Sequence, residues 1–279
     1  MTSSRSLAAA DQKSALQDST RSVVHSARAA LTHLLLASSC SDSAEASCGF
    51  LLLIPGGGHA SVHGAADDEL APCGLWSTAK FAQEHGLEVG TMIRYIEWAL
   101  KCGTGASRLG HHVQPVVLRS YAPETIVAAL DKLEAEARAR GHNTPVVIAA
   151  HSEGGAAAVQ VLRDHERWVS GYEGAAIHIS GMALLDSVHS YKDLPPKGSQ
   201  VGAFLLSGAV VNWVSSSAPL DSVKPKPWVK DGVLGGVRAR SAGTNAHLEV
   251  PSAAFSAVCS FLLQRLYDAS PSRQDEQAA

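Results

Sequence analysis

The segment at residues 146–155 constrains the fold of this chain more than any other. It reads Val-Val-Ile-Ala-Ala-His-Ser-Glu-Gly-Gly, so an apolar, β-branched run leads directly into a serine flanked by small residues. A strand that turns sharply into a helix crowds the positions two before and two after the turning residue, which must therefore be small. Those positions hold Ala150 and Gly154. We predict a strand–turn–helix with Ser152 at its tip.

Ser152 at such a turn has two interpretations. As a nucleophile, it would present its Oγ to solvent ahead of a helix that begins near Gly154, and the positive end of the helix dipole would favour developing negative charge. As a structural residue, it would only cap that helix. The pattern differs from the usual Gly-x-Ser-x-Gly because Ala150 replaces the first glycine.

Composition favours a globular intracellular protein. The chain has 279 residues, of which 46% are hydrophobic and 18% charged, enough to bury a sizeable core. The formal net charge is -3 and no basic stripe occurs, so direct binding of nucleic acid is not expected. The five cysteines form no Cys-x-x-Cys pair and no group has metal-ligand spacing. We therefore expect reduced thiols, no metal and no cofactor.

Membrane association is not expected either. The longest apolar runs, such as residues 50–55, have the length of a strand and not of a membrane span. The N-terminal residues contain no apolar segment typical of a secretory signal.

Strands and helices alternate along most of the chain, which predicts an α/β fold with a doubly wound, mostly parallel sheet. The predicted strands are 49–55, 115–118, 145–150, 175–179, 182–185, 212–215 and 237–241. The predicted helices are 13–37, 90–101, 123–140, 154–165 and 251–267. Of the adjacent strands 175–179 and 182–185, we expect the second to belong to the sheet. Residues 60–88 are predicted to form a polar connection and 224–228 a loop.

The same pattern predicts the domain organisation. We expect an N-terminal tail and helix over residues 1–47, one α/β domain over 48–267 and a polar tail over 268–279. In such sheets the reactive groups gather beyond the carboxyl ends of the strands.

Residues beyond the later strands complete a possible catalytic set. A serine hydroxyl needs a base to take its proton, and the base needs an acid to orient it. Chains of this fold class present them in the order serine, acid, histidine. Asp186 and Asp221 follow strands after Ser152, and His247 lies in a polar loop after the last strand. We predict Asp221 as the acid and Asp186 as the second choice. Without a catalytic role, Asp186 would be a turn residue and His247 a surface histidine.

A glycine run follows the first predicted strand. The backbone N–H groups of Gly57 and Gly58, together with that of Glu153, are predicted to bind an oxyanion. A plain tight turn is the structural alternative, and a phosphate-binding loop is disfavoured because no Lys-Ser/Thr pair follows. The carboxylate of Glu153 beside a nucleophile would disfavour anionic substrates or intermediates. His151 is expected to point away from the serine, as a structural residue or pocket wall.

Several longer stretches carry a family resemblance. They are the Gly56–Gly58 turn, residues 86–96, the 150–155 turn, Ala-Leu-Leu-Asp-Ser-Val-His at 183–189, Asn-Trp-Val-Ser-Ser-Ser-Ala-Pro-Leu-Asp at 212–221 and Ser-Ala-Gly-Thr-Asn-Ala-His at 241–247. Over residues 48–267 the chain resembles the Arb-type (Argonaute-binding protein) domain family. That family includes the animal cotranscriptional regulators of the "family with sequence similarity 172" group.

The resemblance implies an α/β-hydrolase-like fold, a serine nucleophile at Ser152 and a functional histidine at His247. Family members are linked to small-RNA silencing complexes, chromatin and splicing, which implies a nuclear or cytoplasmic location and a silencing or chromatin protein as a possible partner. The chain departs from the family between Cys102 and Pro123, where a Gly/Ser/His-rich insertion displaces the expected strand, and residues 1–47 have no counterpart.

Two functions follow from these observations. The first is a serine hydrolase that acts on a small acyl substrate through an ester, thioester or amide bond. The second is an interaction module without chemistry in a silencing, chromatin or cotranscriptional complex. The presence of a serine, acids and a histidine at strand ends favours the first, and the associations of the family favour the second.

Overall fold

The protein is described from a computed structural model that covers most of the predicted α/β domain. The described residues are 49–57, 74–77, 79–102, 113–141, 143–169, 174–190, 195, 198–223, 233–234 and 236–269, with Ser22, Ser26 and Ala29 as isolated helical positions. Apart from those three positions, the predicted helix at 13–37 lies outside the described residues, as does the predicted loop at 224–228.

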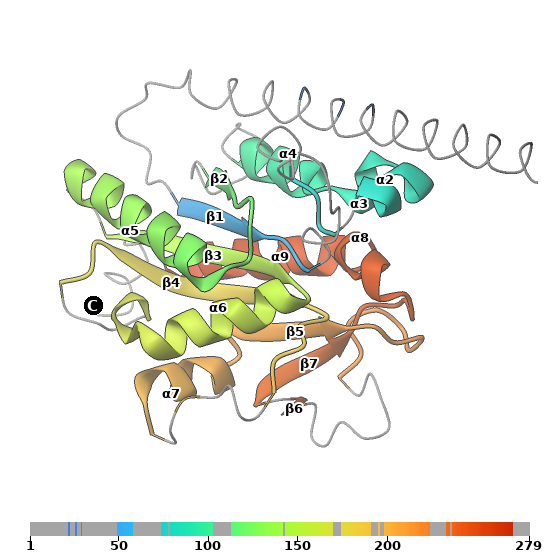
Figure 1. The fold of residues 1–279 in the computed structure, drawn as a ribbon. Helices are drawn as coiled ribbons and strands as arrows, with labels where there is room; N and C mark the ends of the chain where they lie inside the picture. The colour runs from blue at the N-terminus through green and yellow to red at the C-terminus, as the bar shows by residue number, and fades with distance from the viewer. Residues whose placement is uncertain are drawn as a thin grey trace, which may run out of the picture.

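One sheet forms the centre of the molecule (Figure 1). Its strands are β1 (Gly49–Ile54), β2 (Val113–Val117), β3 (Thr144–His151), β4 (Ile177–Leu185), β5 (Val210–Val214), β6 (Val233–Leu234) and β7 (Val237–Ser241). They lie in the order β2-β1-β3-β4-β5-β7-β6, with β6 antiparallel to β7 and the other neighbours parallel. The predicted α/β fold with a mostly parallel sheet is confirmed.

Helices cover both faces of this sheet. They are α2 (Ala79–His85), α3 (Leu87–Gly90), α4 (Ile93–Cys102), α5 (Pro123–Arg140), α6 (Glu153–Asp164), α7 (Gln200–Leu206), α8 (Val250–Ala253) and α9 (Phe255–Asp268), with short 3₁₀ helices η2 (Glu166–Trp168) and η5 (His247–Glu249). In Figure 1, α5 and α6 lie in front of the sheet and α9 behind it. No helix among the described residues is both long and apolar enough to cross a membrane.

The sheet separates two hydrophobic cores because successive strand side chains point to opposite faces. In β1, Phe50, Leu52 and Ile54 pack with residues of α5, α6 and α7. Leu51 and Leu53 pack on the other face with residues of α4, α8 and α9. A strand that is apolar at every position is what burial on both faces requires.

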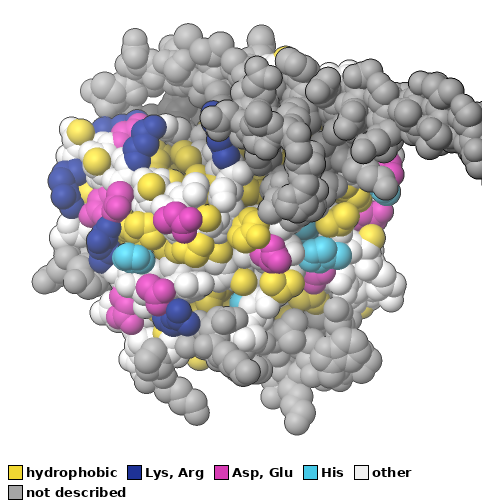
Figure 2. Space-filling view, viewed as in Figure 1, with side chains coloured by type: hydrophobic (Ala, Val, Ile, Leu, Met, Phe, Trp, Pro, Cys, Tyr) yellow, Lys and Arg dark blue, Asp and Glu magenta, His cyan; other side chains and the backbone are white. Residues whose placement is uncertain are grey.

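Helix ends and the outer surface follow ordinary rules. Helix α5 begins with Pro123, whose φ suits a first turn, and ends at Gly141 in the left-handed conformation. On the face shown in Figure 2, acidic and basic side chains are mixed. Along α5 the ion pairs are Arg138–Glu134 and Arg140–Glu136.

Three predictions about elements require correction. Residues 175–179 and 182–185 do not form two separate strands: Ile177–Leu185 is the single strand β4, whose pairing with β3 shifts register at Ser180 and resumes at Gly181. The predicted helix at 251–267 divides into α8 and α9 at Ala254. Helix α2 lies in the region predicted as a polar connection, and α7 was not predicted at all.

The chain winds in opposite directions from β1, with β2 on one side and β3 on the other. Open α/β sheets bind their ligands at the carboxyl ends of the strands on either side of such a reversal, which are β1 and β3 here. Gly56 and Gly57 follow β1 and Ser152 follows β3, so the fold brings these two predicted segments together.

Candidate active site

Ser152 occupies a strained turn between β3 and α6. Its φ of 51° and ψ of -122° lie in a region that residues other than glycine rarely adopt. The N–H of Ser152 donates to Leu185 O at 3.0 Å, and Ser152 O accepts from the N–H of Gly155 at 3.1 Å. These bonds hold the serine to both β4 and α6. The predicted strand–turn–helix is present, with Ser152 at its tip.

Two glycines allow α6 to start so close to the sheet. A Cβ at Gly154 would overlap the carbonyl oxygen of Pro55, at the end of β1. A Cβ at Gly155 would lie 2.5 Å from Ser187 Oγ and 2.6 Å from Ser187 Cβ. The glycine pair therefore fixes the distance between the serine turn and the segments that follow β1 and β4.

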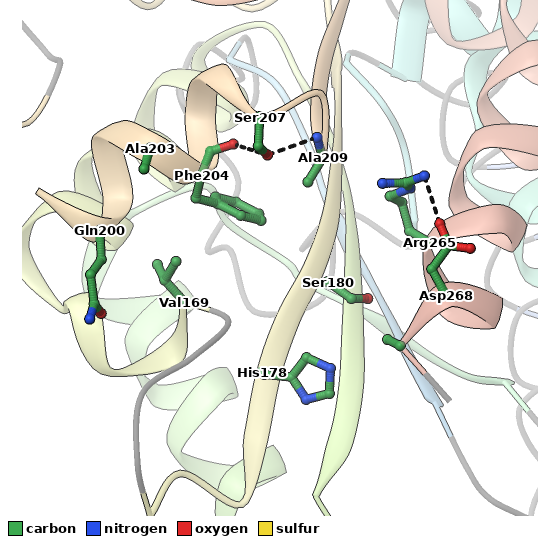
Figure 3. A pocket seen from close by; sticks show the side chains of 11 residues that line it. Val169, His178, Ser180, Gln200, Ala203, Phe204, Ser207, Ala209, Arg265 and Asp268 are labelled. Atoms are coloured by element: carbon green, nitrogen blue, oxygen red, sulfur yellow. Dashed lines mark hydrogen bonds and ion pairs between the residues drawn. The ribbon is translucent and has the colours of Figure 1, made fainter. Parts of the chain in front are cut away.

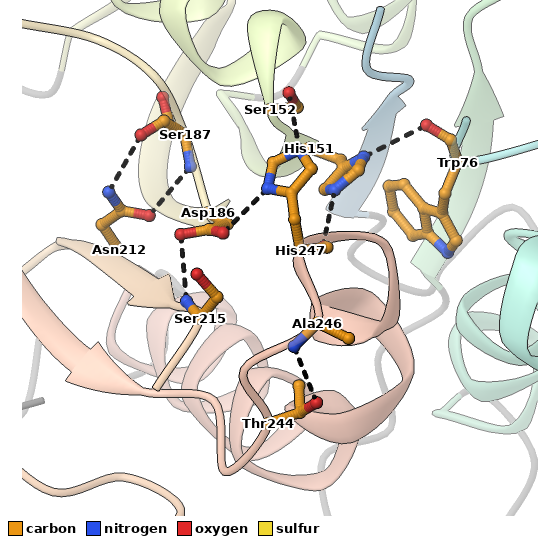
Figure 4. Close-up of polar contacts among 10 residues, drawn as sticks. All are labelled: Trp76, His151, Ser152, Asp186, Ser187, Asn212, Ser215, Thr244, Ala246 and His247. Carbon is orange, nitrogen blue, oxygen red and sulfur yellow. Dashed lines mark hydrogen bonds and ion pairs between the residues drawn. The ribbon is translucent and has the colours of Figure 1, made fainter. Parts of the chain in front are cut away.

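Three side chains form a continuous hydrogen-bonded chain at the carboxyl edge of the sheet (Figure 4). His247 Nε2 lies 3.0 Å from Ser152 Oγ, and His247 Nδ1 lies 2.8 Å from Asp186 Oδ2. With its proton on Nδ1, the neutral imidazole donates to Asp186 and accepts from the Ser152 hydroxyl. The His247 side chain is 40% exposed and that of Asp186 14%, so solvent reaches the base more readily than the acid.

Asp186 is held by the segment that follows β5. Its Oδ1 accepts from the Ser215 N–H at 3.0 Å, and its own N–H donates to Trp213 O at 2.7 Å. Burial acts to raise the pKa of Asp186, but hydrogen bonds from His247 and from the backbone and side chain of Ser215 outweigh it and lower the pKa. Asp186 is therefore a half-buried, oriented carboxylate.

The prediction that Asp221 is the partner of His247 is wrong. Asp221 Oδ1 accepts from Trp213 Nε1 at 3.2 Å, and its N–H donates to Ser241 O at 2.8 Å. The physical reason lies in strand order: β4 is the direct neighbour of β3, whereas β5 is one strand further away. Asp186 directly follows the neighbouring strand and lies beside the serine turn, whereas Asp221 is bonded to Trp213 and to Ser241 at the end of β7.

His151 links the serine turn to the loop that carries the base. Its Nδ1 lies 3.2 Å from Trp76 O, and its Nε2 lies 3.3 Å from His247 O. Its ring packs against that of His247, with centroids 4.8 Å apart. Burial, together with the charge of nearby His247, lowers the pKa of His151 to about 4. The ring is thus neutral at pH 7 and donates to one of the two carbonyls at a time.

The predicted oxyanion site stays a prediction. Among the described residues, no acceptor is found for the N–H of Gly57 or of Glu153, the first residue of α6. Gly57 follows β1 and Glu153 follows β3, at the carboxyl ends of two neighbouring strands. Gly58 lies outside the described residues.

Sequence reasoning missed the residues that support the acid and the base. Asn212, fully buried within β5, accepts from the Ser187 N–H at 3.2 Å and donates to Ser187 O at 3.5 Å, which fixes the turn after Asp186. Thr244 Oγ1 accepts from the Ala246 N–H at 3.1 Å next to His247. A polar residue inside the otherwise apolar β5 was the one available signal.

The described residues contain no group of three or more His, Cys, Asp or Glu that could hold a metal ion. A separate pocket of about 490 Å³ lies between β4, α7 and α9 (Figure 3), lined among others by His178, Ser180, Phe204 and Arg265. His178 and Ser180 lie near the start of β4, and Asp186 directly follows its end. This pocket is therefore toward the amino ends of the strands, away from Asp186.

Compared with models of protein families, with curated proteins and with solved structures, the chain shows no match.

Proposed function

We propose that this chain is a serine hydrolase that cleaves a small ester, thioester or amide. The observation that carries the proposal is the Asp186–His247–Ser152 chain, with distances of 2.8 and 3.0 Å, at a strained turn. A serine that only capped α6 would need neither the unfavourable φ nor an oriented histidine and carboxylate. No side-chain capping bond of Ser152 to α6 is present.

The proposed reaction begins with attack of Ser152 Oγ on the substrate carbonyl carbon while His247 Nε2 takes the hydroxyl proton. The ionised Asp186 stabilises the resulting imidazolium and keeps the Nδ1 proton. The tetrahedral oxyanion would be bound by the N–H groups of Gly57 and Glu153, which have no acceptor among the described residues.

The bond to the leaving group then breaks, and His247 donates its Nε2 proton to the departing oxygen, sulfur or nitrogen. Water attacks the acyl-serine, with His247 again as the base, and releases a carboxylic acid and the free hydroxyl of Ser152. Both steps use only side chains and backbone groups of this chain.

An active-site-directed fluorophosphonate tests this proposal. We expect it to label the folded protein at Ser152, as located by mass spectrometry of the peptide, and Ser152→Ala to abolish the labelling. Because Ser152 packs little side-chain volume, Ser152→Ala should change the free energy of unfolding by less than about 1 kcal/mol.

Ser180→Ala is the matched control, since Ser180 lies within β4 and away from the carboxyl end that leads to Asp186. This variant should label as the unmodified protein does. Absence of labelling of the correctly folded protein, or equal labelling after Ser152→Ala, contradicts the proposal. That outcome would favour the interaction module that the resemblance to Arb-type domains suggests.

A further inference from the structure

The carboxylate of Glu153 lies directly beside the proposed oxyanion site. Glu153 is the first residue of α6 and its side chain is exposed. A Cβ built on Gly57 would overlap Glu153 Oε2 and lie 2.6 Å from Glu153 Cδ. The carboxylate therefore fills the space next to the glycine turn that any side chain at position 57 would occupy.

The Tyr121 hydroxyl lies beside this carboxylate. The pKa of Tyr121 is raised, chiefly by its interaction with Glu153 and less by burial. Tyr121 lies in the segment between β2 and α5, so the Glu153 side chain meets a residue from a distant part of the chain as well as Gly57.

No positive charge balances Glu153 in the part of the chain that the structure describes. None of the ion pairs found there includes it. Exposed carboxylates are negatively charged at neutral pH. A negative charge next to Gly57 opposes the negative charge that develops on a substrate oxygen held by the same backbone.

We propose that Glu153 is a specificity-determining residue that selects substrates with a cationic group a few bonds from the scissile carbonyl. This inference rests on the proposed hydrolase function. A quaternary or primary ammonium in that position would pair with the carboxylate and offset its repulsion of the oxyanion. Anionic acyl groups would suffer the repulsion twice, once from their own charge and once from the oxyanion.

Neutral isosteres allow a sharp test. One pair of substrates carries the cation on the alcohol side: the butyrate esters of choline and of 3,3-dimethylbutanol. A second pair carries it on the acyl side: the p-nitrophenyl esters of 4-(trimethylammonio)butyrate and of 5,5-dimethylhexanoate. Each pair differs by one nitrogen and one charge, so shape and size are matched.

We expect kcat/KM for the cationic member of at least one pair to exceed that of its isostere by about fivefold, the effect of one solvent-exposed ion pair. The pair that shows the preference identifies the side on which the cation binds. Glu153→Gln should reduce the ratio to near one, partly by raising hydrolysis of the neutral ester. Tyr121→Phe should reduce it in part, because the carboxylate loses the hydroxyl beside it.

Glu166→Gln is the control, since Glu166 lies beyond the other end of α6 and the substitution removes the same charge. It should leave both ratios unchanged. Hydrolysis that depends on Ser152 but shows equal or lower kcat/KM for both cationic esters overturns the role of Glu153 and leaves the proposed function intact. The same holds for a cationic preference that Glu153→Gln does not alter. Absence of any hydrolysis that depends on Ser152 overturns both proposals.

Discussion

At the level of single residues, the acid beside His247 has the sharpest predicted effect on turnover. Asp186→Asn keeps the shape of the side chain but removes the charge that stabilises the imidazolium and fixes the Nδ1 tautomer. We expect kcat to fall by about 10⁴-fold. Asp221→Asn should stay within about twofold of the unmodified protein, because an amide oxygen can still accept from Trp213. Steady-state hydrolysis of one accepted ester by both variants measures the difference, and the opposite ranking would return the role to Asp221.

His151 makes the stability of the protein depend on pH. Its pKa is about 4 in the folded state, below the 6.5 of an unperturbed histidine, so the unfolded chain binds one more proton between these values. The contribution of His151 to the free energy of unfolding therefore rises as pH increases from 4 to 6.5 and is constant above 6.5. Over this range the contribution changes by about 3 kcal/mol.

We expect His151→Asn to lose less stability than the unmodified protein between pH 7 and pH 4, since Asn does not titrate but can still donate to a carbonyl. Urea unfolding at both values measures the two losses, and their difference isolates this one histidine from the others. Equal losses would show that His151 is already protonated in the fold.

The residues of the site differ in how far the sequence could predict them. Ser152 was predictable because small neighbours on both sides are a local requirement of its turn. His247 was predictable because it lies in a polar loop directly after a strand. The choice between Asp186 and Asp221 depends on which strand lies next to β3, and sequence order does not contain that information. His151 was predicted only as a structural residue or pocket wall, because its contact with His247 joins residues 96 positions apart.

At the level of elements, the close packing of α6 on the sheet reverses the usual effect of a glycine-to-alanine substitution on stability. Replacing a helical glycine with alanine normally stabilises a protein by about 0.5–1 kcal/mol. Gly155→Ala should instead destabilise this one by about 1–3 kcal/mol, because the new Cβ meets Ser187. Thermal or urea unfolding gives the value, together with the rate of fluorophosphonate labelling.

Ser187→Gly supplies the test of this cause. It removes the two atoms that the new Cβ would approach most closely, so the double variant should be more stable than the sum of the single effects predicts. Simple additivity of the two changes would place the origin of the loss elsewhere in α6.

The elements themselves were predicted unevenly. The buried strands β1 and β3 and the long helix α5 have strong local patterns, with continuous apolar runs in the strands and a Pro–Gly pair at the ends of the helix. The seven-residue helices α2 and α7 were missed because two turns offer too few periodic positions. Strand β4 was divided at Ser180-Gly181 since both residues are typical of turns. The register with β3 shifts at Ser180, and pairing resumes at Gly181 in the same strand.

At the level of the whole molecule, the sheet divides the interior into two cores that should respond independently. Ile126 of α5 is buried on one face and Ile96 of α4 on the other. Substitution of either by valine should cost about 0.5–1.5 kcal/mol, and the two losses should add to within about 0.5 kcal/mol. Urea unfolding of both single variants and the double variant provides the test. A coupling larger than this would mean that the sheet transmits packing strain between its faces.

For the proposed hydrolase, the strand order also governs when Ser152 gains its base during synthesis. Ser152 leaves the ribosome 95 residues before His247, an interval of about 5 to 20 s at ordinary rates of translation. During that interval the serine has no base, because β5 and β7 must join the sheet before the loop that carries His247 reaches it. A nascent or C-terminally truncated chain would hold an inert hydroxyl. Reaction with a fluorophosphonate would therefore label only those molecules in which the C-terminal part of the chain, with His247, has folded onto the rest of the domain.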